Sequence, residues 1–472
     1  MTQQTHAQQT HAQHTHAQQT HAQHTHAQQL ATRFAKLSYN DITPASRHAV
    51  KRLLLDYIGV ALAGSQSESG HIARRFAREQ GATGTKTGAQ LIGDNAKSSM
   101  ATTAFANAIS SHSIELDDID VLALFHFSPP VYSSALAVAD ATKANGKQLV
   151  TALAAGCEMM ERVSRAANNS LRNRSFHTTP TCGVFGATIA AAKILKLNAD
   201  KITNALGMAG AQASGLMEMY GPSMQKRFNP GPTARNGVTA ALMAQLGFTG
   251  ADTIFEGERG FLKAFTDKNF PGKLIEGINK PYKLLIEFKP YSCARPIHNA
   301  IDCALAVRKQ PGFNVNKVKS IAFTRHPDWA HYHQNKAPRT YHEAQVSLPF
   351  SVAVAFLEGQ ALLKQYSDRN IRNAKVKQLS NATTIAVDAK LPRGVSCKMV
   401  ATMSDGRKFT SQIDYPKGSI ENPMNDEELL VKFTSLASPV IGEKRAAALA
   451  DAVMNIEKCA DVSKLLAMAS KK

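Results

Sequence analysis

Cysteine is scarce in this sequence, and no pair has the spacing of a metal site. There are six cysteines in 472 residues, and no two of them form a CxxC pattern, so a zinc knuckle or a disulfide framework is not expected. No stretch approaches the roughly 20 uncharged residues of a membrane-spanning helix. The N-terminus also lacks the basic start and hydrophobic core of a secretory signal. These absences predict a soluble, cytoplasmic protein with reduced cysteines.

The motifs that bind common cofactors are missing as well. The sequence contains no GxxxxGK[ST] phosphate loop, no GxGxxG turn after a strand, no HExxH metal site and no GxSxG nucleophile elbow. We therefore expect neither a metal nor an organic cofactor. An enzyme with this sequence would have to work with its own side chains.

Basic residues are in excess, with a formal net charge of +19. A nucleic-acid-binding protein would concentrate its cations in runs interleaved with aromatic residues. Here the cations are scattered, and Trp329 is the single tryptophan. We expect no nucleic-acid and no membrane partner, and we interpret the charge as attraction for a small acidic substrate.

Composition and periodicity divide the chain into four parts. The THAQQ and THAQH repeats cannot bury apolar surface, so residues 1–29 are expected to form a disordered tail. Residues 30–287 are patterned as a large helical domain, and residues 288–424 as a smaller α+β domain. Residues 425–472 return to helical patterning and are expected to pack on the first domain. The predicted fold class is mainly α, with a helical domain formed by both chain ends and an α+β lid.

Apolar spacings of three and four residues, bounded by proline, glycine and asparagine, predict the individual helices. Their many alanines and glycines favour close approach of the helix axes. In the α+β part, alternation predicts strands, and Asp405-Gly406 predicts a hairpin turn. The expected helices are 48–64, 129–146, 147–168, 183–197, 199–219, 233–247 and 350–363, and the expected strands are 318–325, 383–390 and a pair within 395–415.

Two polar clusters that contain histidine interrupt the helical part. The segment SHSIELDDIDVLALFHFSPP has Glu115, Asp117 and Asp118 upstream of His126. Acidic runs are often solvated loops, so this cluster alone is weak evidence for a site. His177 precedes a threonine-rich turn that opens an Ala/Gly-rich helix, where free N–H groups can bind an anion. A capping threonine beside a solvated histidine would give the same pattern.

Two further clusters supply cations. The segment MQKRFNPGPTARNG places Lys226 and Arg227 just before a predicted helix, an arrangement that suits carboxylate binding. The segment FKPYSCARPIHNAID lies where the two domains join, so Lys289 and Arg295 would face an interdomain cleft. Basic residues at such a junction also commonly pair with acids across it.

Histidines and cations without cofactor motifs fit proton transfer on a polycarboxylate. A carbon next to a carboxylate is weakly acidic, and nearby cations stabilise the charge that develops when its proton leaves. A histidine near its neutral pKa can move that proton. We therefore interpret the cations as groups that hold an acidic substrate.

Nearly the whole chain after the tail resembles the MmgE/PrpD family, which includes 2-methylcitrate dehydratase, cis-aconitate decarboxylase and iminodisuccinate epimerase. The resemblance implies a helical domain built from both chain ends, an α+β lid, a homodimer and catalysis without metal or organic cofactor. The segments that carry it are LLLDYIGVALAG, ELDD followed by HFSPP, GLMEMYGPSMQKRFNPGPTARNG, GERGFLKAF, KPYSCARPIHNAID and HEAQVSLPFSVAVAFLEG.

The resemblance also assigns roles to residues. Its decarboxylase branch implies that two histidines act as acid and base, that acidic residues position them and that cations hold the substrate carboxylates. The implied catalytic residues are His126, His177, Lys226, Glu115 and Asp117, and the implied substrate-binding residues are Arg227, Lys289 and Arg295.

Four positions depart from the family pattern. Phe127 replaces the proline of an HPS element, Ile119 a threonine, Asn229 a histidine and Phe350 a lid tyrosine. The leading hypothesis is a lyase that dehydrates or decarboxylates a tricarboxylic acid of the 2-methylcitrate or cis-aconitate type. The alternative is an epimerase in which the two histidines move a proton between the faces of one carbon. A third interpretation is a non-catalytic protein that binds acids or nucleic acid.

Overall fold

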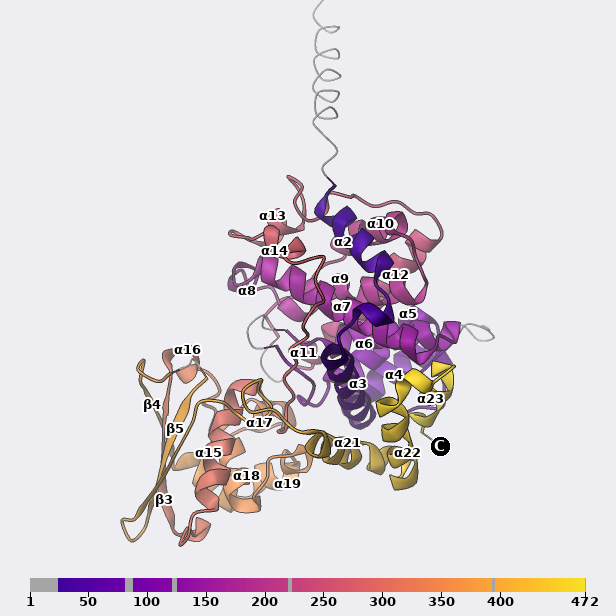
Figure 1. Cartoon of the computed structure of the whole chain (residues 1–472). Helices are drawn as coiled ribbons and strands as arrows, with labels where there is room; N and C mark the ends of the chain where they lie inside the picture. The colour runs from indigo at the N-terminus through magenta and orange to yellow at the C-terminus, as the bar shows by residue number, and fades with distance from the viewer. Residues whose placement is uncertain (1–23, 81–87, 121–124, 220–222, 393–394, 472) are drawn as a thin grey trace, which may run out of the picture.

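A computed structural model describes residues 24–80, 88–120, 125–219, 223–392 and 395–471. It consists of a large helical body and a smaller body that contains a sheet (Figure 1). The expected fold class is confirmed, because helices dominate and the only sheets among the described residues have two and four strands.

The large body takes its helices from two separate stretches of the chain. Its core joins residues from Ala27 to Phe288 with residues from Met424 to Ala469. The first stretch also holds a short antiparallel pair, β1 (Ala89–Gln90) and β2 (Lys97–Ser98). In the second, α21 packs along α3. The helices are α2 (His26–Lys36), α3 (Pro44–Ser65), α4 (Glu68–Glu79), α5 (Met100–His112), α6 (Ser128–Thr142), α7 (Gly146–Ala167), α8 (Ser170–Asn173), α9 (Thr178–Ile194), α10 (Ala199–Gly210), α11 (Gln225–Phe228), α12 (Pro230–Gln245), α13 (Phe261–Phe265), α14 (Gly272–Ile275), α21 (Asp426–Ile441), α22 (Glu443–Met454) and α23 (Val462–Met468).

Helix α9 is central to this body and contacts α6, α7, α10 and α12. Glycines allow it to approach α7 closely. A Cβ atom on Gly156 would lie 2.8 Å from the carbonyl oxygen of Gly186, and a Cβ atom on Gly186 would lie 2.7 Å from that of Gly156. The expected close approach of helix axes is therefore present, and it fixes the helix that begins beside His177.

Two predicted boundaries in this body are wrong. Helix α2 already begins at His26, because Thr25 caps it and forms a capping box with Gln28, so the last THAQ repeat belongs to the fold. Residues 1–23 of the expected tail lie outside the described residues. The helix predicted over 199–219 ends at Gly210, and the chain then turns so that the Gly215 carbonyl accepts from the backbone N–H of His177 at 3.0 Å.

The smaller body is the lid. Its sheet has the order β4-β3-β5-β6, with β3 parallel to β4 and antiparallel to β5. Strand β3 alternates largely between buried and exposed residues, because one face of the sheet packs on α15 and the helix α18 behind it. Helix α18 ends before Gly359, which has a φ of 73°, so the prediction of helix to residue 363 was too long. The elements are α15 (His298–Arg308), β3 (Val318–Arg325), α16 (Pro327–Ala330), α17 (Tyr341–Gln345), α18 (Leu348–Glu358), α19 (Asp368–Arg372), α20 (Ala374–Asn381), β4 (Thr383–Val387), β5 (Cys397–Met403) and β6 (Lys408–Ile413).

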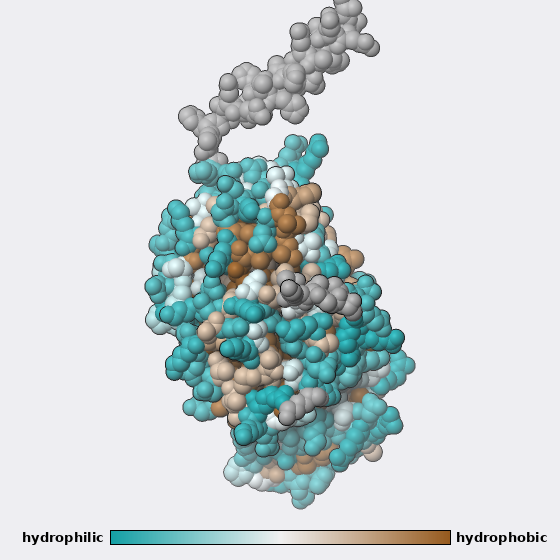
Figure 2. All heavy atoms as spheres, turned by 90° about the vertical axis from the view of Figure 1, so that its right-hand side faces the viewer, coloured by the Kyte–Doolittle hydropathy of each residue, from teal (hydrophilic) through white to brown (hydrophobic). Residues whose placement is uncertain are grey.

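The outer surface is largely hydrophilic on the face drawn in Figure 2, with some hydrophobic areas among the hydrophilic residues. Among the described residues, no helix has the length and hydropathy needed to cross a membrane.

Candidate active site

A cavity of about 160 Å³ lies where the helical body meets the lid. Six of the eight residues singled out in the sequence line it, and the other two, Asp117 and Arg227, are buried directly behind it. This volume is small for a ligand pocket and suits a small acid rather than a nucleotide. The six lining residues are Glu115, His126, His177, Lys226, Lys289 and Arg295.

The segment between α5 and α6 is anchored from several sides. The Asp118 carboxylate accepts from the backbone N–H groups of Phe127 at 2.7 Å and Ser128 at 3.0 Å, so it caps the start of α6. On the other side, Lys432 of α21 donates to the Leu116 carbonyl at 2.7 Å and pairs with Asp56 at 2.6 Å. These contacts hold the site residues of the segment in place.

Glu115 is the point on which the cations converge. Its carboxylate pairs with Lys226, with Arg227 Nη1 at 3.0 Å and with Lys289 Nζ at 3.4 Å, and all four side chains are buried. Burial alone would raise the pKa of Glu115, but the three cations hold it well below its usual range. Its backbone φ of 54° lies in the left-handed region, which is uncommon for a residue other than glycine. Three cations around one carboxylate leave a net positive charge.

Lys226 has a pKa that lies close to neutral pH. Burial lowers its pKa to about 8, and the Glu115 carboxylate opposes that shift. Lys226 therefore stays protonated at neutral pH and lines the cavity, where it can bind an anion.

His126 has a defined protonation at one ring nitrogen. Its Nδ1 lies 2.6 Å from the Asp118 carbonyl oxygen and 3.0 Å from Asp117 Oδ2. Because both neighbours are acceptors, Nδ1 carries a proton and Nε2 is left for chemistry. The two acceptors fix the orientation of the His126 ring, and its Nε2 is the atom that can exchange a proton with a ligand in the cavity.

His112 is a site residue that the sequence analysis missed. It is fully buried, its Nδ1 lies 2.7 Å from Asp117 Oδ2, and its ring packs edge-on against His126 with centroids 4.8 Å apart. Burial lowers its pKa to about 4, so it is neutral. For Asp117, burial opposes ionisation, but His126, His112 and Lys289 hold its pKa well below the usual range. His112 stands three residues before Glu115, and that spacing at a helix end was the available signal.

The group His112, Asp117 and His126 could in principle hold a metal ion, since its ligand atoms lie within 4.8 Å of one another. The donors do not fit that role well. Both Nδ1 atoms already contact the same oxygen of Asp117, and Lys289 Nζ lies 3.9 Å from the other. A dication would have to compete with that ammonium group.

His177 precedes the first turn of α9 and faces the same cavity. Its Nδ1 accepts from the Asn229 side-chain amide at 3.0 Å, so its proton lies on Nε2. Burial holds the pKa of His177 well below its usual range, and the charges of Lys226 and Arg172 act in the same direction. It is therefore a neutral hydrogen-bond donor beside a proton-bearing His126.

Arg295 lines the cavity with its charge already balanced. Its Nη2 lies 2.8 Å from Glu287 Oε2, and its Nη1 donates to the Lys417 carbonyl at 3.0 Å. For Arg295, the structure therefore supports the alternative named in the sequence analysis, in which a basic residue at the domain junction pairs with an acid. Arg295 can still add hydrogen bonds to a ligand, but it contributes little free charge.

The lid supplies part of the cavity wall. Trp329 and His333 line it, and neither was assigned to the site from the sequence, although HPDWAHYHQ concentrates aromatic and histidine residues after the end of β3. The lid also reaches the buried cations, since Gln345 accepts from Arg227 at 3.1 Å and donates to the Ile114 carbonyl at 2.8 Å. Gln345 thus connects the lid directly to the Glu115 cluster.

Comparison with protein families gives two matches that together span most of the chain. Residues 28–272 match the MmgE/PrpD N-terminal domain and residues 291–458 match the MmgE/PrpD C-terminal domain. The chain belongs to the MmgE/PrpD family.

Several proteins are similar to this family member over nearly their whole length. A cis-aconitate decarboxylase-like protein, oryM, of Aspergillus oryzae is 28% identical over 94% of this chain and 96% of its own. The cis-aconitate decarboxylase of Aspergillus terreus is 27% identical over 92% and 93%. The human cis-aconitate decarboxylase is 27% identical over 92% of each chain.

The positions that depart from the family pattern differ in whether they lie at the cavity. Ile119 lines the cavity and Asn229 orients His177, so both act on the site. Phe350 lies in the core of the lid against Tyr366 and is not among the lining residues. Phe350 therefore does not form part of the wall of this cavity.

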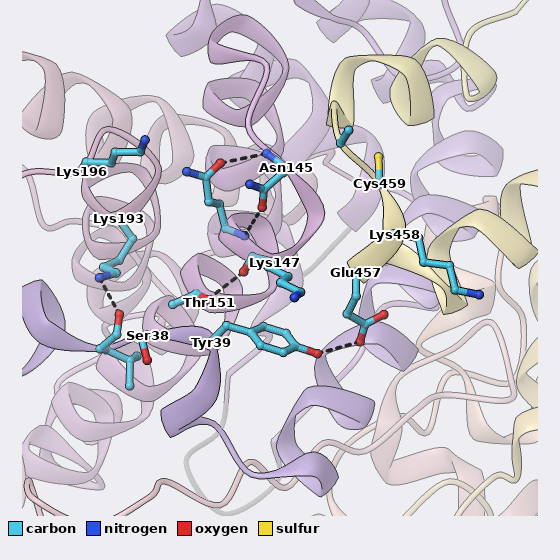
Figure 3. Close-up of a pocket in the computed structure, with 13 residues that line it drawn as sticks. Ser38, Tyr39, Asn145, Lys147, Thr151, Lys193, Lys196, Glu457, Lys458 and Cys459 are labelled. Atoms are coloured by element: carbon cyan, nitrogen blue, oxygen red, sulfur yellow. Dashed lines mark hydrogen bonds between the residues drawn. The ribbon is translucent and has the colours of Figure 1, made fainter.

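A larger hollow, of about 570 Å³, lies elsewhere on the helical body, between α2, α7, α9 and the segment after α22 (Figure 3). Its lysines do not converge on one point. Lys193 donates to the Leu37 carbonyl at 2.9 Å, Lys147 lies 5.6 Å from the Tyr39 ring centroid, and the Tyr39 hydroxyl donates to Glu457 at 3.1 Å. These interactions join structural elements and leave no focused charge.

Proposed function

We propose that this protein is a cofactor-independent lyase that removes one carboxylate from a small tricarboxylic acid of the cis-aconitate type. The observation that carries the proposal is the convergence of Lys226, Arg227 and Lys289 on Glu115, beside His126. Such a preorganised positive field binds substrate carboxylates and stabilises charge that develops on them. The names of the similar fungal and human proteins support the same substrate class.

In the proposed reaction, Lys226 and Lys289 hold the carboxylates that remain. The departing carboxylate lies against apolar lining residues, of which the cavity has Ile119, Met219 and Val395. Breaking the carbon–carbon bond releases neutral CO₂ and leaves the electron pair on the substrate, delocalised over the neighbouring double bond. An apolar wall favours this loss of charge over retention of the carboxylate.

His126 completes the reaction by supplying a proton. Its imidazolium, paired with Asp117, donates the Nε2 proton to the carbanionic carbon system and is reprotonated from solvent. The substrate thus loses CO₂ and gains one proton. His177 keeps its proton and donates a hydrogen bond from Nε2 to a substrate oxygen.

A second candidate function is epimerisation of an acidic substrate. The specific observation in its favour is that two histidines with different protonation, His126 and His177, face one cavity. One could remove a proton from a carbon while the other delivers a proton to the opposite face, with nothing leaving the substrate.

The test is proton NMR in D₂O with protein dialysed against EDTA. Separate tubes contain cis-aconitate, trans-aconitate, citrate, 2-methylcitrate or iminodisuccinate. We expect new vinyl signals and release of CO₂ with cis-aconitate, and one deuterium in the unsaturated dicarboxylate product. The His126→Asn variant, checked for native circular dichroism, is the matched control and should form no product.

Other outcomes would contradict the proposal in distinct ways. Loss of water from 2-methylcitrate without CO₂ would make the protein a dehydratase. Exchange of one C–H for deuterium, with the substrate otherwise intact, would favour the epimerase. Silence in every tube would overturn both candidate functions for these acids.

A further inference from the structure

The cations around the cavity differ in whether they already have a partner. Lys226, Arg227 and Lys289 share Glu115, and Arg295 pairs with Glu287. Arg172 also lines the cavity, yet no carboxylate of the described residues forms an ion pair with it. The contact described for its guanidinium is a weak one, from Nη1 to Met217 Sδ at 3.7 Å.

The degree of burial explains why some of these cations have a carboxylate partner and Arg172 does not. A fully buried charge without a partner is strongly destabilising, so the buried cations at the cavity need Glu115 and Glu287 even when the cavity holds no ligand. Arg172 is only half-buried, so water can solvate it until a ligand arrives. It is therefore the cation whose charge is most available to a ligand carboxylate.

Arg172 reaches the cavity from a different element than the cations of the Glu115 cluster. It belongs to α8, five residues before His177, and its charge is one of those that lower the pKa of His177. Lys226 and Lys289 reach the cavity from α11 and from the domain junction. A ligand that spans the cavity can meet the Glu115 cluster with one end and Arg172 with another.

We propose that Arg172 is a specificity-determining residue that binds one further carboxylate of the substrate and so selects tricarboxylic over dicarboxylic acids. The guanidinium fork suits this role, because it can form two parallel hydrogen bonds to one carboxylate. This inference rests on the proposed function for its substrate class, but it concerns binding and can be tested without turnover.

The experiment compares non-reactive acids that differ in one carboxylate. The affinity for propane-1,2,3-tricarboxylate is compared with the affinities for two dicarboxylates. Glutarate lacks the central carboxylate, and methylsuccinate lacks one terminal carboxylate. Binding is followed by the fluorescence of Trp329, which is the single tryptophan and lines the cavity, and by calorimetry. The variants are Arg172→Gln and Arg172→Lys, with Arg174→Gln as the matched control, because Arg174 lies two residues away in a pair with Asp267.

We expect Arg172→Gln to weaken binding of the tricarboxylate by roughly 10- to 100-fold, the usual range for one charged hydrogen-bonded contact. For at least one dicarboxylate, the affinities of the Arg172→Gln variant and of the unaltered protein should agree within about threefold. That ligand lacks the carboxylate that would contact Arg172, so the substitution removes no contact from it. Arg172→Lys should recover part of the loss, and Arg174→Gln should change neither affinity.

Equal losses for the tricarboxylate and both dicarboxylates, or no loss at all, would overturn the role of Arg172. So would failure of the unaltered protein to bind the tricarboxylate. If the unaltered protein binds it with the expected dependence on Arg172 but turns over none of the acids tested above, the subsite stands and the lyase proposal fails.

Discussion

Helix α9 has a lysine-lined hollow at each end. His177 precedes its first turn at the cavity between the two bodies, and Lys193 lies in its last turn at the larger hollow of Figure 3. Helix α9 has 17 residues and is therefore about 25 Å long, so the two hollows lie at well-separated ends. The larger hollow has more than three times the volume, about 570 Å³ against about 160 Å³.

The difference between them lies in burial and convergence rather than in the number of lysines. In the cavity, Lys226 and Lys289 are buried and point at one carboxylate beside histidines. In the larger hollow, the lysines reach carbonyl groups and an aromatic ring, and none of its described lining residues is a histidine. Charges that solvent screens contribute little, whereas the same charges in a dry, focused site can do chemistry.

The largest contrast should come from removing one lysine at each end of α9. Lys226→Met removes a cation that lines the cavity, and we expect kcat/KM to fall by about 10³-fold, as for loss of a preorganised group at a developing charge. Lys196→Met, in the larger hollow, should stay within twofold of the unaltered protein. Steady-state kinetics with the acid identified by NMR measures both. Comparable losses in the two variants would remove the distinction between the two hollows.

A smaller effect is expected from a histidine that lies behind the cavity. His112→Gln removes the second partner of Asp117, which orients His126, so kcat should fall by about 10- to 100-fold with little change in KM. The lower limb of the pH profile should also shift, because the Asp117 charge is no longer shared between two rings. His48→Gln, at a half-exposed pair with Asp426, is the control. A change in KM alone would show that His112 shapes binding rather than proton delivery.

The smallest effect is a pH dependence of binding. Since the pKa of Lys226 is lowered to about 8, its charge is present below that pH and is lost above it. We expect kcat/KM to fall by about tenfold per pH unit above about pH 8. Lys226→Arg keeps its charge over this range, so the fall should move to higher pH in that variant if it retains activity. An active arginine variant with the same upper limb would assign the titration to another group.

Much of the architecture could be predicted from the sequence, because helix ends and apolar spacing are local properties. Thr25 and Gln28 show the limit of that approach, since their capping box lies inside a repeat whose composition predicts disorder. The end of α10 was misjudged for a similar reason. Residues 211–219 keep an Ala-rich helical composition, but the contact of Gly215 with His177 holds them in a turn.

The site residues could be named from motifs, but not their relations. Lys226 and Glu115 are 111 positions apart in the chain, and no periodicity reports that they meet. The sequence also does not show that Arg295 has a carboxylate partner while Arg172 has only a weak contact to a sulfur atom. Only the neighbours of each guanidinium decide whether its charge is available to a ligand. His112 was missed because its importance depends on a shared carboxylate oxygen rather than on a motif.

The contact between Lys432 and the Leu116 carbonyl also bears on how the protein is made. The two residues are 316 positions apart, so a ribosome adds the residue that braces the active-site segment long after the segment itself. At 5 to 20 residues per second, the delay is roughly 16 to 60 seconds. During that interval the growing chain carries Asp56 and the Glu115 segment without α21, while the whole lid is synthesised in between. In a nascent chain the contact between Lys432 and the Leu116 carbonyl can therefore form only after the whole lid has been synthesised.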